Sequence, residues 1–357
     1  MPNLHDVDDL DPDAWERVLA LALEWPPVQR LKGQGVALLF EKPSARTRNS
    51  CEMAVVDLGG HPVYIQGAEV GLDTRETAED VARTLASYHR VLCARVFDHG
   101  IFARMTAALE RSGFDVPVVN LLSDDAHPCQ AVADVVTMRE ALGPLRARTL
   151  AYVGDANNMA RSLAKAGLLE GMEVRIAAPE GYAFSPAELS SLRAFGDAAG
   201  RGGTIELSDD PAQAAKGAAA LYTDVWTSMG QEQEMAVRRA AFAGYTIDEQ
   251  LVGLAADDAV VLHCLPAHRG EEITNSVLEG PRSVVWKQAA HRRTAMRGIL
   301  TWAVQPPGHS TGKGKTKGEG NSKGKGKSKS KGTGTGSGNG NSPGNRRGSR
   351  KGRGARK

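Results

Sequence analysis

The segment 44–48 (Ser-Ala-Arg-Thr-Arg) groups hydroxyl and guanidinium side chains in a way that suits an anion. It follows an apolar run, Val36 to Phe40, which is typical of a buried strand, and it precedes a helical pattern. A strand that turns into a helix aims backbone N–H groups and the helix dipole at one point. The hydroxyls of Ser44 and Thr47 and the forked donors of Arg46 would complete a phosphate cradle there. The alternative is a turn whose charges are only solvated.

Two further polar groups follow predicted strands. Arg95 ends one of them, and in isolation a lone arginine at a strand end is usually a solvated charge. The segment 124–130 follows another strand and opens a helix, with Pro128 suited to the first helical position. His127 and Gln130 can both reach a ligand at that helix start, and the histidine can donate to a carbonyl or an oxyanion. The alternative is that His127 only caps the helix.

Amide and carboxylate groups follow two strands later in the chain. The segment 154–158 (Gly-Asp-Ala-Asn-Asn) lacks the GxGxxG pattern of a dinucleotide site, but asparagine amides can bind a small zwitterion. In the segment 223–230, Asp224 supplies a negative charge that suits an ammonium group. Ser228 lies four residues further on, within reach of the same ligand.

The segment 263–270 ends the last predicted strand and contains His263, Cys264 and His268. These three side chains raise a zinc hypothesis, but their spacing matches no structural zinc pattern. A covalent role for Cys264 would need a base, and along a continued strand His263 points to the opposite face. We therefore expect the cysteine to be a polar contact at the floor of a site. The Leu265-Pro266 bond is a candidate cis peptide in a tight turn.

The elements that position these groups alternate between strands and helices. The predicted strands are Val36–Phe40, Val63–Ile65, Val91–Phe97, Val116–Leu122, Thr149–Val153, Glu173–Ala177, Thr204–Leu207, Ala219–Thr223 and Ala259–Leu262. The predicted helices include Glu76–His89, Gln130–Leu142, Met159–Glu170, Pro186–Ala199 and a final Thr294–Val304. This alternation predicts an α/β fold of two doubly wound domains, each a mostly parallel sheet with helices on both faces, divided near Gly143-Pro144. Because ligands of such sheets bind beyond the carboxyl ends of strands, every polar group above lies where a ligand is expected.

Composition separates the body of the chain from its end. Of the 357 residues, the segment 308–357 holds 15 Lys or Arg, one acid and no aromatic residue, Leu, Ile, Val or Met. Such a tail cannot bury a core, so we expect 307–357 to be disordered, and the rest of the chain has a formal charge of −12. No apolar run approaches the roughly 20 residues that cross a membrane, and the acidic start does not resemble a signal peptide. Four scattered cysteines without a CxxC pair indicate reduced thiols and a cytoplasmic location.

Five motifs carry a resemblance to a known family. In chain order, FEKPSARTR, HPCQ, GDANN, TDVWTSMG and HCLPAHRGEE resemble the aspartate/ornithine transcarbamoylases, and among them the members that use ornithine. The likeness runs from about Leu31 to Leu300. It implies carbamoyl transfer from carbamoyl phosphate to the side-chain amine of L-ornithine, giving L-citrulline and phosphate, in either arginine biosynthesis or arginine breakdown. It further implies a homotrimer or a multiple of trimers, with no organic cofactor and no metal.

The resemblance also implies a division of labour along the chain. A carbamoyl phosphate domain would span 1–142 and be completed by a helix at about 290–306 that crosses back to it, and an ornithine domain would span 143–289. The implied carbamoyl phosphate contacts are Ser44, Ala45, Arg46, Thr47, Arg95, His127, Pro128, Cys129, Gln130, Cys264, Leu265 (through its carbonyl) and Arg292. The implied ornithine contacts are Asn158, Asp224, Ser228 and Met229. The implied catalytic residues are Arg95, His127, Asp224 and Cys264.

Two positions depart from the family pattern. Ala45 replaces the threonine of Ser-Thr-Arg-Thr-Arg, which removes one hydroxyl from the cradle but leaves a backbone N–H. We expect a modest weakening of carbamoyl phosphate binding. Glu69 stands where many relatives carry a glutamine, and a carboxylate near a phosphate is unfavourable unless it is paired, so we leave it out of the site.

The sequence leaves two other classes of function open. Related enzymes carbamoylate aspartate, putrescine or acetylated ornithine, and the Ser228-Met229-Gly230 motif favours ornithine over aspartate. A different class, nucleic-acid binding, is suggested by the basic tail, which would contact polyanions non-specifically and with strong salt dependence. The tail has no aromatic residues that could stack on bases, so we expect it to be a dispensable appendage.

Overall fold

The computed structural model describes residues 1–227 and 232–305. The predicted disordered tail and two predicted ornithine ligands, Ser228 and Met229, lie outside these described residues. Within the described part of the chain, no helix has both the length and the apolar character needed to cross a membrane.

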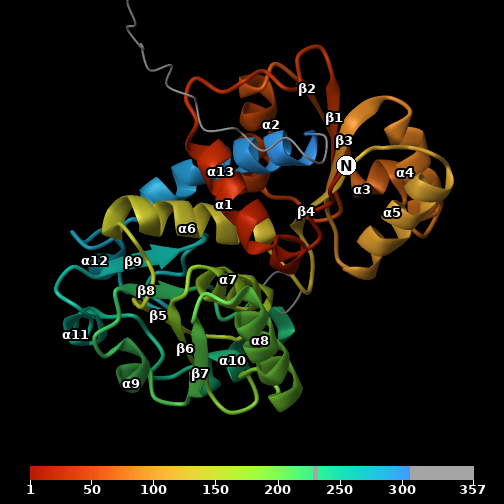
Figure 1. The fold of residues 1–357 in the computed structure, drawn as a ribbon. Helices are drawn as coiled ribbons and strands as arrows, with labels where there is room; N and C mark the ends of the chain where they lie inside the picture. The colour runs from red at the N-terminus through yellow and green to blue at the C-terminus, as the bar shows by residue number, and fades with distance from the viewer. Residues whose placement is uncertain (228–231, 306–357) are drawn as a thin grey trace, which may run out of the picture. The chain divides into compact units, whose positions relative to one another are not determined.

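The first sheet contains four parallel strands in the order β2-β1-β3-β4 (Figure 1). They are β1 (Gly35–Phe40), β2 (His61–Gln66), β3 (His89–Arg95) and β4 (Val118–Leu122). Side chains of β1 alternate between two cores, with Leu38 and Phe40 in one and Ala37 and Leu39 in the other. The helices α4 (Ala78–Ala86) and α5 (Gly100–Arg111) therefore cover one face, and α2 (Ala45–Asp57) covers the other.

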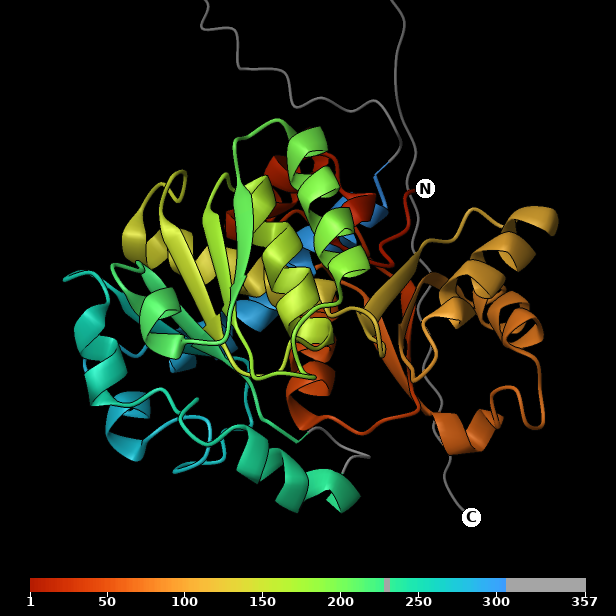
Figure 2. The ribbon, with the colours of Figure 1, turned by 90° about the horizontal axis from the view of Figure 1, so that it is seen from below.

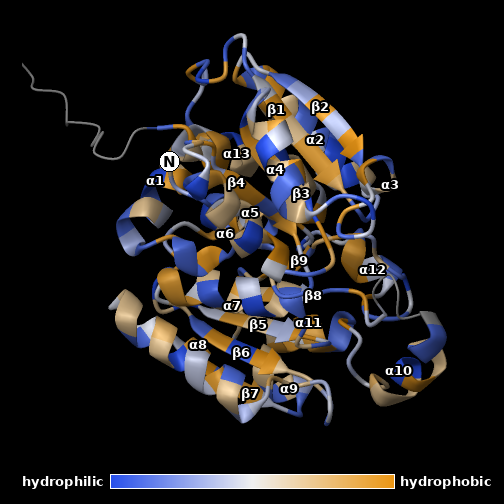
Figure 3. Cartoon of the chain, turned by 90° about the vertical axis from the view of Figure 1, so that its right-hand side faces the viewer, coloured by the Kyte–Doolittle hydropathy of each residue, from blue (hydrophilic) through white to orange (hydrophobic). Residues whose placement is uncertain are grey.

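The second sheet contains five parallel strands in the order β7-β6-β5-β8-β9. They are β5 (Thr149–Val153), β6 (Glu173–Ala177), β7 (Thr204–Ser208), β8 (Ala220–Thr223) and β9 (Val260–His263). One face packs against α7 (Asn158–Leu169) and α8 (Pro186–Ala199), and the other against α9 (Pro211–Ala215), α11 (Glu249–Leu254) and α12 (Asn275–Leu278). Figure 2 shows helices on both sides of this sheet, and Figure 3 shows hydrophobic positions along strands such as β1, β2 and β6.

This architecture confirms the predicted α/β class, with two parallel sheets each covered on both faces. The largest core cluster runs from β1 through α6 (Pro128–Leu142) to β5 and β8, so both sheets share it. The residue ranges given above for the two domains stay a prediction.

The last described helix, α13 (Val285–Ala303), returns from the second sheet and packs against α1 (Pro12–Leu23), α2 and α6 (Figure 1). It packs closely on α1 at Gly298, where the Cβ of any other residue would lie 2.5 Å from the carbonyl oxygen of Val18. The helix predicted at 294–304 begins nine residues earlier than predicted, at Val285. As a consequence Arg292, expected after the last strand, lies inside a helix that contacts both halves of the chain.

Other element boundaries differ from prediction for local reasons. β4 begins at Val118, after Pro117, which has no N–H to donate. α4 begins only after Thr77, whose hydroxyl accepts a hydrogen bond from the N–H of Asp80 at 3.2 Å. The remaining described elements are α3 (Gly67–Val70), α10 (Met235–Ala241) and the 3₁₀ turns Val7–Asp9 and Glu232–Glu234.

Candidate active site

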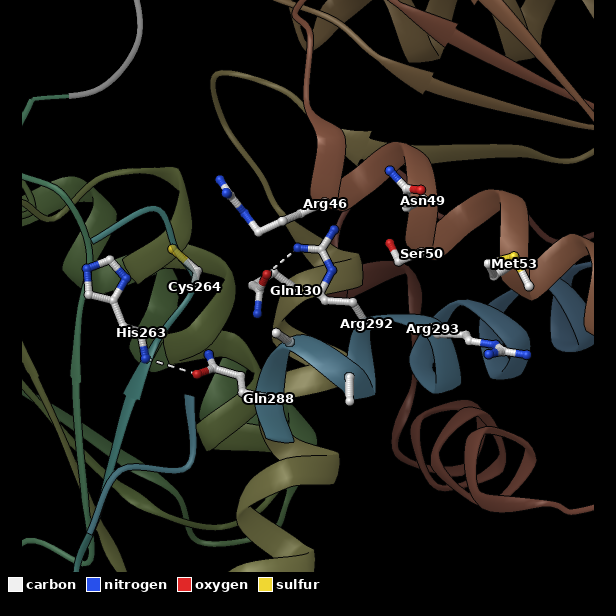
Figure 4. Close-up of a pocket in the computed structure, with 12 residues that line it drawn as sticks. Arg46, Asn49, Ser50, Met53, Gln130, His263, Cys264, Gln288, Arg292 and Arg293 are labelled. Carbon is white, nitrogen blue, oxygen red and sulfur yellow. Dashed lines mark hydrogen bonds between the residues drawn. The ribbon is translucent and has the colours of Figure 1, made fainter. Parts of the chain in front are cut away.

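The carboxyl ends of strands from both sheets border one cleft of about 1260 Å³. Eleven of the predicted site residues line it. They come from the end of β3 and the turns after β1 and β4 on one side, from the turns after β5, β8 and β9 on the other, and from α13. They are Ser44, Ala45, Arg46, Thr47, Arg95, His127, Asn158, Asp224, Cys264, Leu265 and Arg292. A second cavity of about 380 Å³ shares Arg46, Cys264 and Arg292 with the cleft and adds Gln130 (Figure 4).

The predicted anion cradle lies at the start of α2. Ser44 is its N-cap, and its hydroxyl oxygen accepts the N–H of Thr47 at 3.3 Å. Ala45 opens the helix, so the departure from the family pattern removes a hydroxyl group at the helix start and leaves the backbone N–H in place. The structure separates the two guanidinium groups of this segment. Arg46 lines the cleft, whereas Arg48 lies over the ring of Tyr64, 3.9 Å from its centroid.

Two buried arginines from different elements join this cradle. Arg95 is 6% exposed at the end of β3, and Arg292 is 6% exposed on α13. Within the described residues, neither guanidinium makes an ion pair with a carboxylate. Burial, followed by the nearby charges of Arg292 and Arg46, lowers the pKa of Arg95 to about 10. This side of the cleft is therefore electropositive.

His127 is held neutral beside these arginines. Burial, then the charges of Arg292, Arg95 and Arg46, lower the pKa of His127 well below its usual value. Arg292 Nη1 lies 3.4 Å from His127 Nε2, and because a guanidinium can only donate, Nε2 accepts and the ring proton resides on Nδ1. Nδ1 is buried without a hydrogen-bond partner among the described residues. A buried N–H donor without a partner is suited to a ligand carbonyl.

The backbone of His127 is fixed from the amino-terminal end of the chain. Its N–H donates to the hydroxyl of Ser162 at 2.9 Å, and that hydroxyl donates to Asp6 Oδ1 at 3.1 Å. Asp6 accepts in turn from Lys165 Nζ at 2.5 Å. Because a carboxylate only accepts, the Ser162 proton goes to Asp6 and leaves a lone pair for the histidine N–H.

The residues that follow His127 are not equally placed. Pro128 occupies the first turn of α6, as the sequence indicates. The Cys129 thiol donates to the carbonyl of Asn120 at 3.2 Å and packs in the hydrophobic core, so its side chain does not border the cleft. Gln130 accepts a hydrogen bond from Arg292, which Figure 4 shows as a dashed line.

An acidic group faces the arginines from the second sheet. Asp224 follows β8, and its Oδ1 accepts from the Cys264 thiol at 2.9 Å and from the N–H of Val225 at 2.8 Å. Burial, then the charge of Asp224, raise the pKa of Cys264 well above its usual value. The thiol is therefore protonated, which fits a polar contact and not a nucleophile. Asn158 donates to the carbonyl of Ser123 at 2.7 Å and links the two sheets.

His263 is occupied and does not offer a metal ligand. Its Nδ1 accepts the N–H of Leu265 at 2.9 Å, and its Nε2 lies 3.0 Å from Glu272 Oε1. Asp224, His263 and Cys264 gather ligand atoms within 4.8 Å of one another, and both ring nitrogens of His263 are already engaged by the chain. The predicted cis bond between Leu265 and Pro266 is present.

Several cleft residues were not identified from the sequence. Lys42 borders the cleft, and its Nζ lies 3.1 Å from Asp124 Oδ1. Because Lys42 stands two residues before Ser44, its place in the sequence could have identified it as a cleft residue. Arg238, which bonds Asp155 Oδ2 at 2.7 Å, also borders the cleft. No local pattern around Arg238 predicts that placement. Glu69, left out of the predicted site, is exposed on α3 and does not line the cleft.

Comparisons with known proteins agree with the geometry. Residues 3–140 match the family model "Aspartate/ornithine carbamoyltransferase, carbamoyl-P binding domain", and residues 146–303 match its "Asp/Orn binding domain". The ornithine carbamoyltransferase of Acidothermus cellulolyticus is 50% identical over 275 residues, covering 77% of this chain and 86% of that protein. The solved ornithine carbamoyltransferase of Pyrococcus furiosus superimposes with a TM-score of 0.79 at 39% identity, covering 84% of this chain and 96% of that one. The Thermus thermophilus structure gives 0.75 at 39% identity, with 85% and 99% covered.

Proposed function

Since the chain belongs to the aspartate/ornithine carbamoyltransferase family, we propose that it transfers the carbamoyl group of carbamoyl phosphate to the side-chain amine of L-ornithine. The products are L-citrulline and phosphate, in a step of arginine metabolism. The observation that carries this proposal is the cleft itself, where Arg46, Arg95 and Arg292 face Asp224. The side with the arginines matches a dianionic phosphate, and the side with Asp224 matches an ammonium group.

Carbamoyl phosphate is assigned to the side of the first sheet. The phosphate would accept from the N-terminal turn of α2, with Ser44, Ala45 and Thr47, and from Arg46 and Arg292. The His127 Nδ1–H and the Arg95 guanidinium would donate to the carbamoyl oxygen. Polarising that carbonyl makes its carbon electrophilic and stabilises the oxyanion that forms on attack.

Ornithine is assigned to the side of the second sheet. Asp224, Cys264 and Asn158 would orient it, together with Ser228 and Met229, which lie outside the described residues. The side-chain ammonium of ornithine first loses a proton to solvent. The neutral amine then attacks the carbonyl carbon, so a C–N bond forms. The bond from that carbon to the phosphate oxygen then breaks, and the amine proton leaves with phosphate or to solvent. Carbamoyl phosphate is already an activated donor, so this chemistry calls on no cofactor.

We propose the cytoplasm as the compartment of this enzyme. All four cysteines are free, and three of them, Cys51, Cys93 and Cys129, are buried. Thiols kept in this form fit a reducing environment.

The substrate assignment is tested by a colorimetric citrulline assay with carbamoyl phosphate and a panel of acceptors. We expect strong turnover with ornithine, and little with putrescine, acetylated ornithine or aspartate, because the cleft offers both a carboxylate and amides to a free amino acid. Strong turnover of putrescine without ornithine would overturn the assignment in favour of the sibling enzyme.

The phosphate cradle is tested by a matched pair of substitutions on α2. Arg46→Ala should lower kcat/KM for carbamoyl phosphate about 100-fold, because it removes charge-assisted hydrogen bonds of about 1.5–3 kcal/mol each. Arg48→Ala should stay within about threefold of the parent, because Arg48 instead pairs with Glu52 at 2.8 Å and lies over Tyr64. Equal losses in the two variants would contradict the cradle as assigned.

We propose a homotrimer, or a multiple of trimers, as the assembly. The motif resemblance supports this, and two apolar side chains of α2, Met53 and Val56, are 42% and 50% exposed, as at a surface that a partner covers. Light scattering on the full chain should then give three times the 37.9 kDa of one chain, or a multiple of it. A monodisperse monomer at assay concentration would rule the assembly out.

A further inference from the structure

A fully buried carboxylate lies behind the site and takes no part in the chemistry above. Asp134 is one helical turn after Gln130 on α6 and has 0% of its surface exposed. Its Oδ1 accepts from Gln130 Nε2 and from Gln288 Nε2, both at 2.7 Å. Its Oδ2 accepts from the Tyr222 hydroxyl at 3.0 Å. These partners come from α6, α13 and β8.

The first amide contact sets the direction of a group in the site. An ionised carboxylate can only accept, so Gln130 must turn its NH₂ toward Asp134. The amide oxygen of Gln130 then faces the other way, toward Arg292 Nη1, with which it makes a hydrogen bond. A reversed amide would point N–H groups at a guanidinium that has only N–H groups of its own. The orientation of Arg292, and its contact with His127 Nε2, therefore depends on the acceptor behind Gln130.

The second amide contact acts on the other half of the site. Gln288 turns its NH₂ toward the same Asp134 oxygen, and its amide oxygen accepts the backbone N–H of His263 at 2.9 Å. His263 is the last residue of β9 and directly precedes Cys264. Figure 4 shows both outer hydrogen bonds, from Gln130 to Arg292 and from Gln288 to His263.

We propose that Asp134 is a positioning residue that orients the carbamoyl phosphate side and the ornithine side of the cleft together, through the amides of Gln130 and Gln288. This inference rests on the proposed function. One acceptor oxygen serves both amides, so the direction of each is tied to the same atom. The network joins α13 to the first turn of α6, through Gln130, and to the end of β9, through His263.

The ionisation of Asp134 is consistent with this role. Burial raises its pKa to about 6, against the lowering effect of its three hydrogen-bond donors and of Arg292. The carboxyl group is therefore mostly ionised at neutral and alkaline pH, where it acts as an acceptor only.

Two substitutions at position 134 separate an acceptor from a merely structural carboxylate. Asp134→Leu fills the space but offers no acceptor, so we expect about a tenfold or larger rise in KM for carbamoyl phosphate and in the Kd of inorganic phosphate by calorimetry. Asp134→Asn can present one oxygen to both amides and turn its NH₂ toward the Tyr222 hydroxyl, so both constants should stay within about threefold of the parent. Equal losses in the two variants, or a normal phosphate Kd in Asp134→Leu, would overturn the proposal.

Gln288→Leu tests the second arm and keeps the proposal falsifiable if Asp134→Leu does not fold. It removes the contact to His263 together with the donors to Asp134 and Tyr222, but it leaves the contact between Asp134 and Gln130 that orients Arg292. KM for ornithine should therefore rise at least about threefold while the Kd of inorganic phosphate stays unchanged. The reverse pattern, or no change in either constant, would contradict the two-armed arrangement. Phosphate binding is read without turnover, so the two failures can be told apart. A parent chain that binds phosphate but makes no citrulline would refute the proposed function, whereas a parent chain that makes citrulline while its Asp134→Leu variant keeps a normal phosphate Kd would refute this inference alone.

Discussion

The structure depends on holding three guanidinium groups close together, two of which, those of Arg95 and Arg292, make no ion pair with a carboxylate of the described residues. Arg46, Arg95 and Arg292 come from a helix start, a strand end and the middle of a helix, and the last two are almost fully buried. Like charges in a partly dehydrated cleft repel one another, so the arrangement is unfavourable until an anion arrives. The fold maintains it because α2, β3 and α13, which carry the three arginines, are all held by buried residues of the largest hydrophobic core. Burial and then the same charges lower the pKa of His127 and keep its ring neutral, which leaves an N–H without a partner among the described residues for the uncharged end of that anion.

The return of α13 completes this arrangement, because α13 carries Arg292 into the cleft. Without it the first sheet would supply only the cradle and Arg95, and the second sheet only Asp224 and the turn after β9. α13 begins beside β9, packs on α1, α2 and α6, and brings Arg292 and Gln288 between the two halves. The close approach at Gly298 and the buried acceptor Asp134 fix how deeply that helix sits. The side chains at the strand ends are therefore positioned by buried contacts of α13, at Gly298 and at Asp134.

Much of the fold and of the candidate site is predictable from the sequence. The rest is not predictable, and the reason is physical. Apolar runs identified the nine strands nearly in place, and because ligands of parallel sheets bind at carboxyl ends, they also indicated which polar groups would converge. Patterns of that kind say which residues follow a strand, but not which way each side chain turns. Arg46 and Arg48 are equivalent by type and spacing, yet only Arg46 enters the cleft. Cys129 lies in a site motif while its thiol packs in the core. Asp134 depends on partners up to 154 residues away, which no local pattern reports.

The central claim is that the electropositive side of the cleft is an anion site, and its most direct test is the stability of the protein in the presence of the anion. The midpoint of thermal unfolding should be measured against inorganic phosphate and carbamoyl phosphate, with sodium chloride added to hold ionic strength constant. A ligand that binds only the folded state at 100 times its Kd stabilises it by about 2.7 kcal/mol, so we expect a saturable rise of several degrees. Arg46→Ala should reduce that rise strongly. A midpoint that responds to phosphate no more than to chloride would contradict the account.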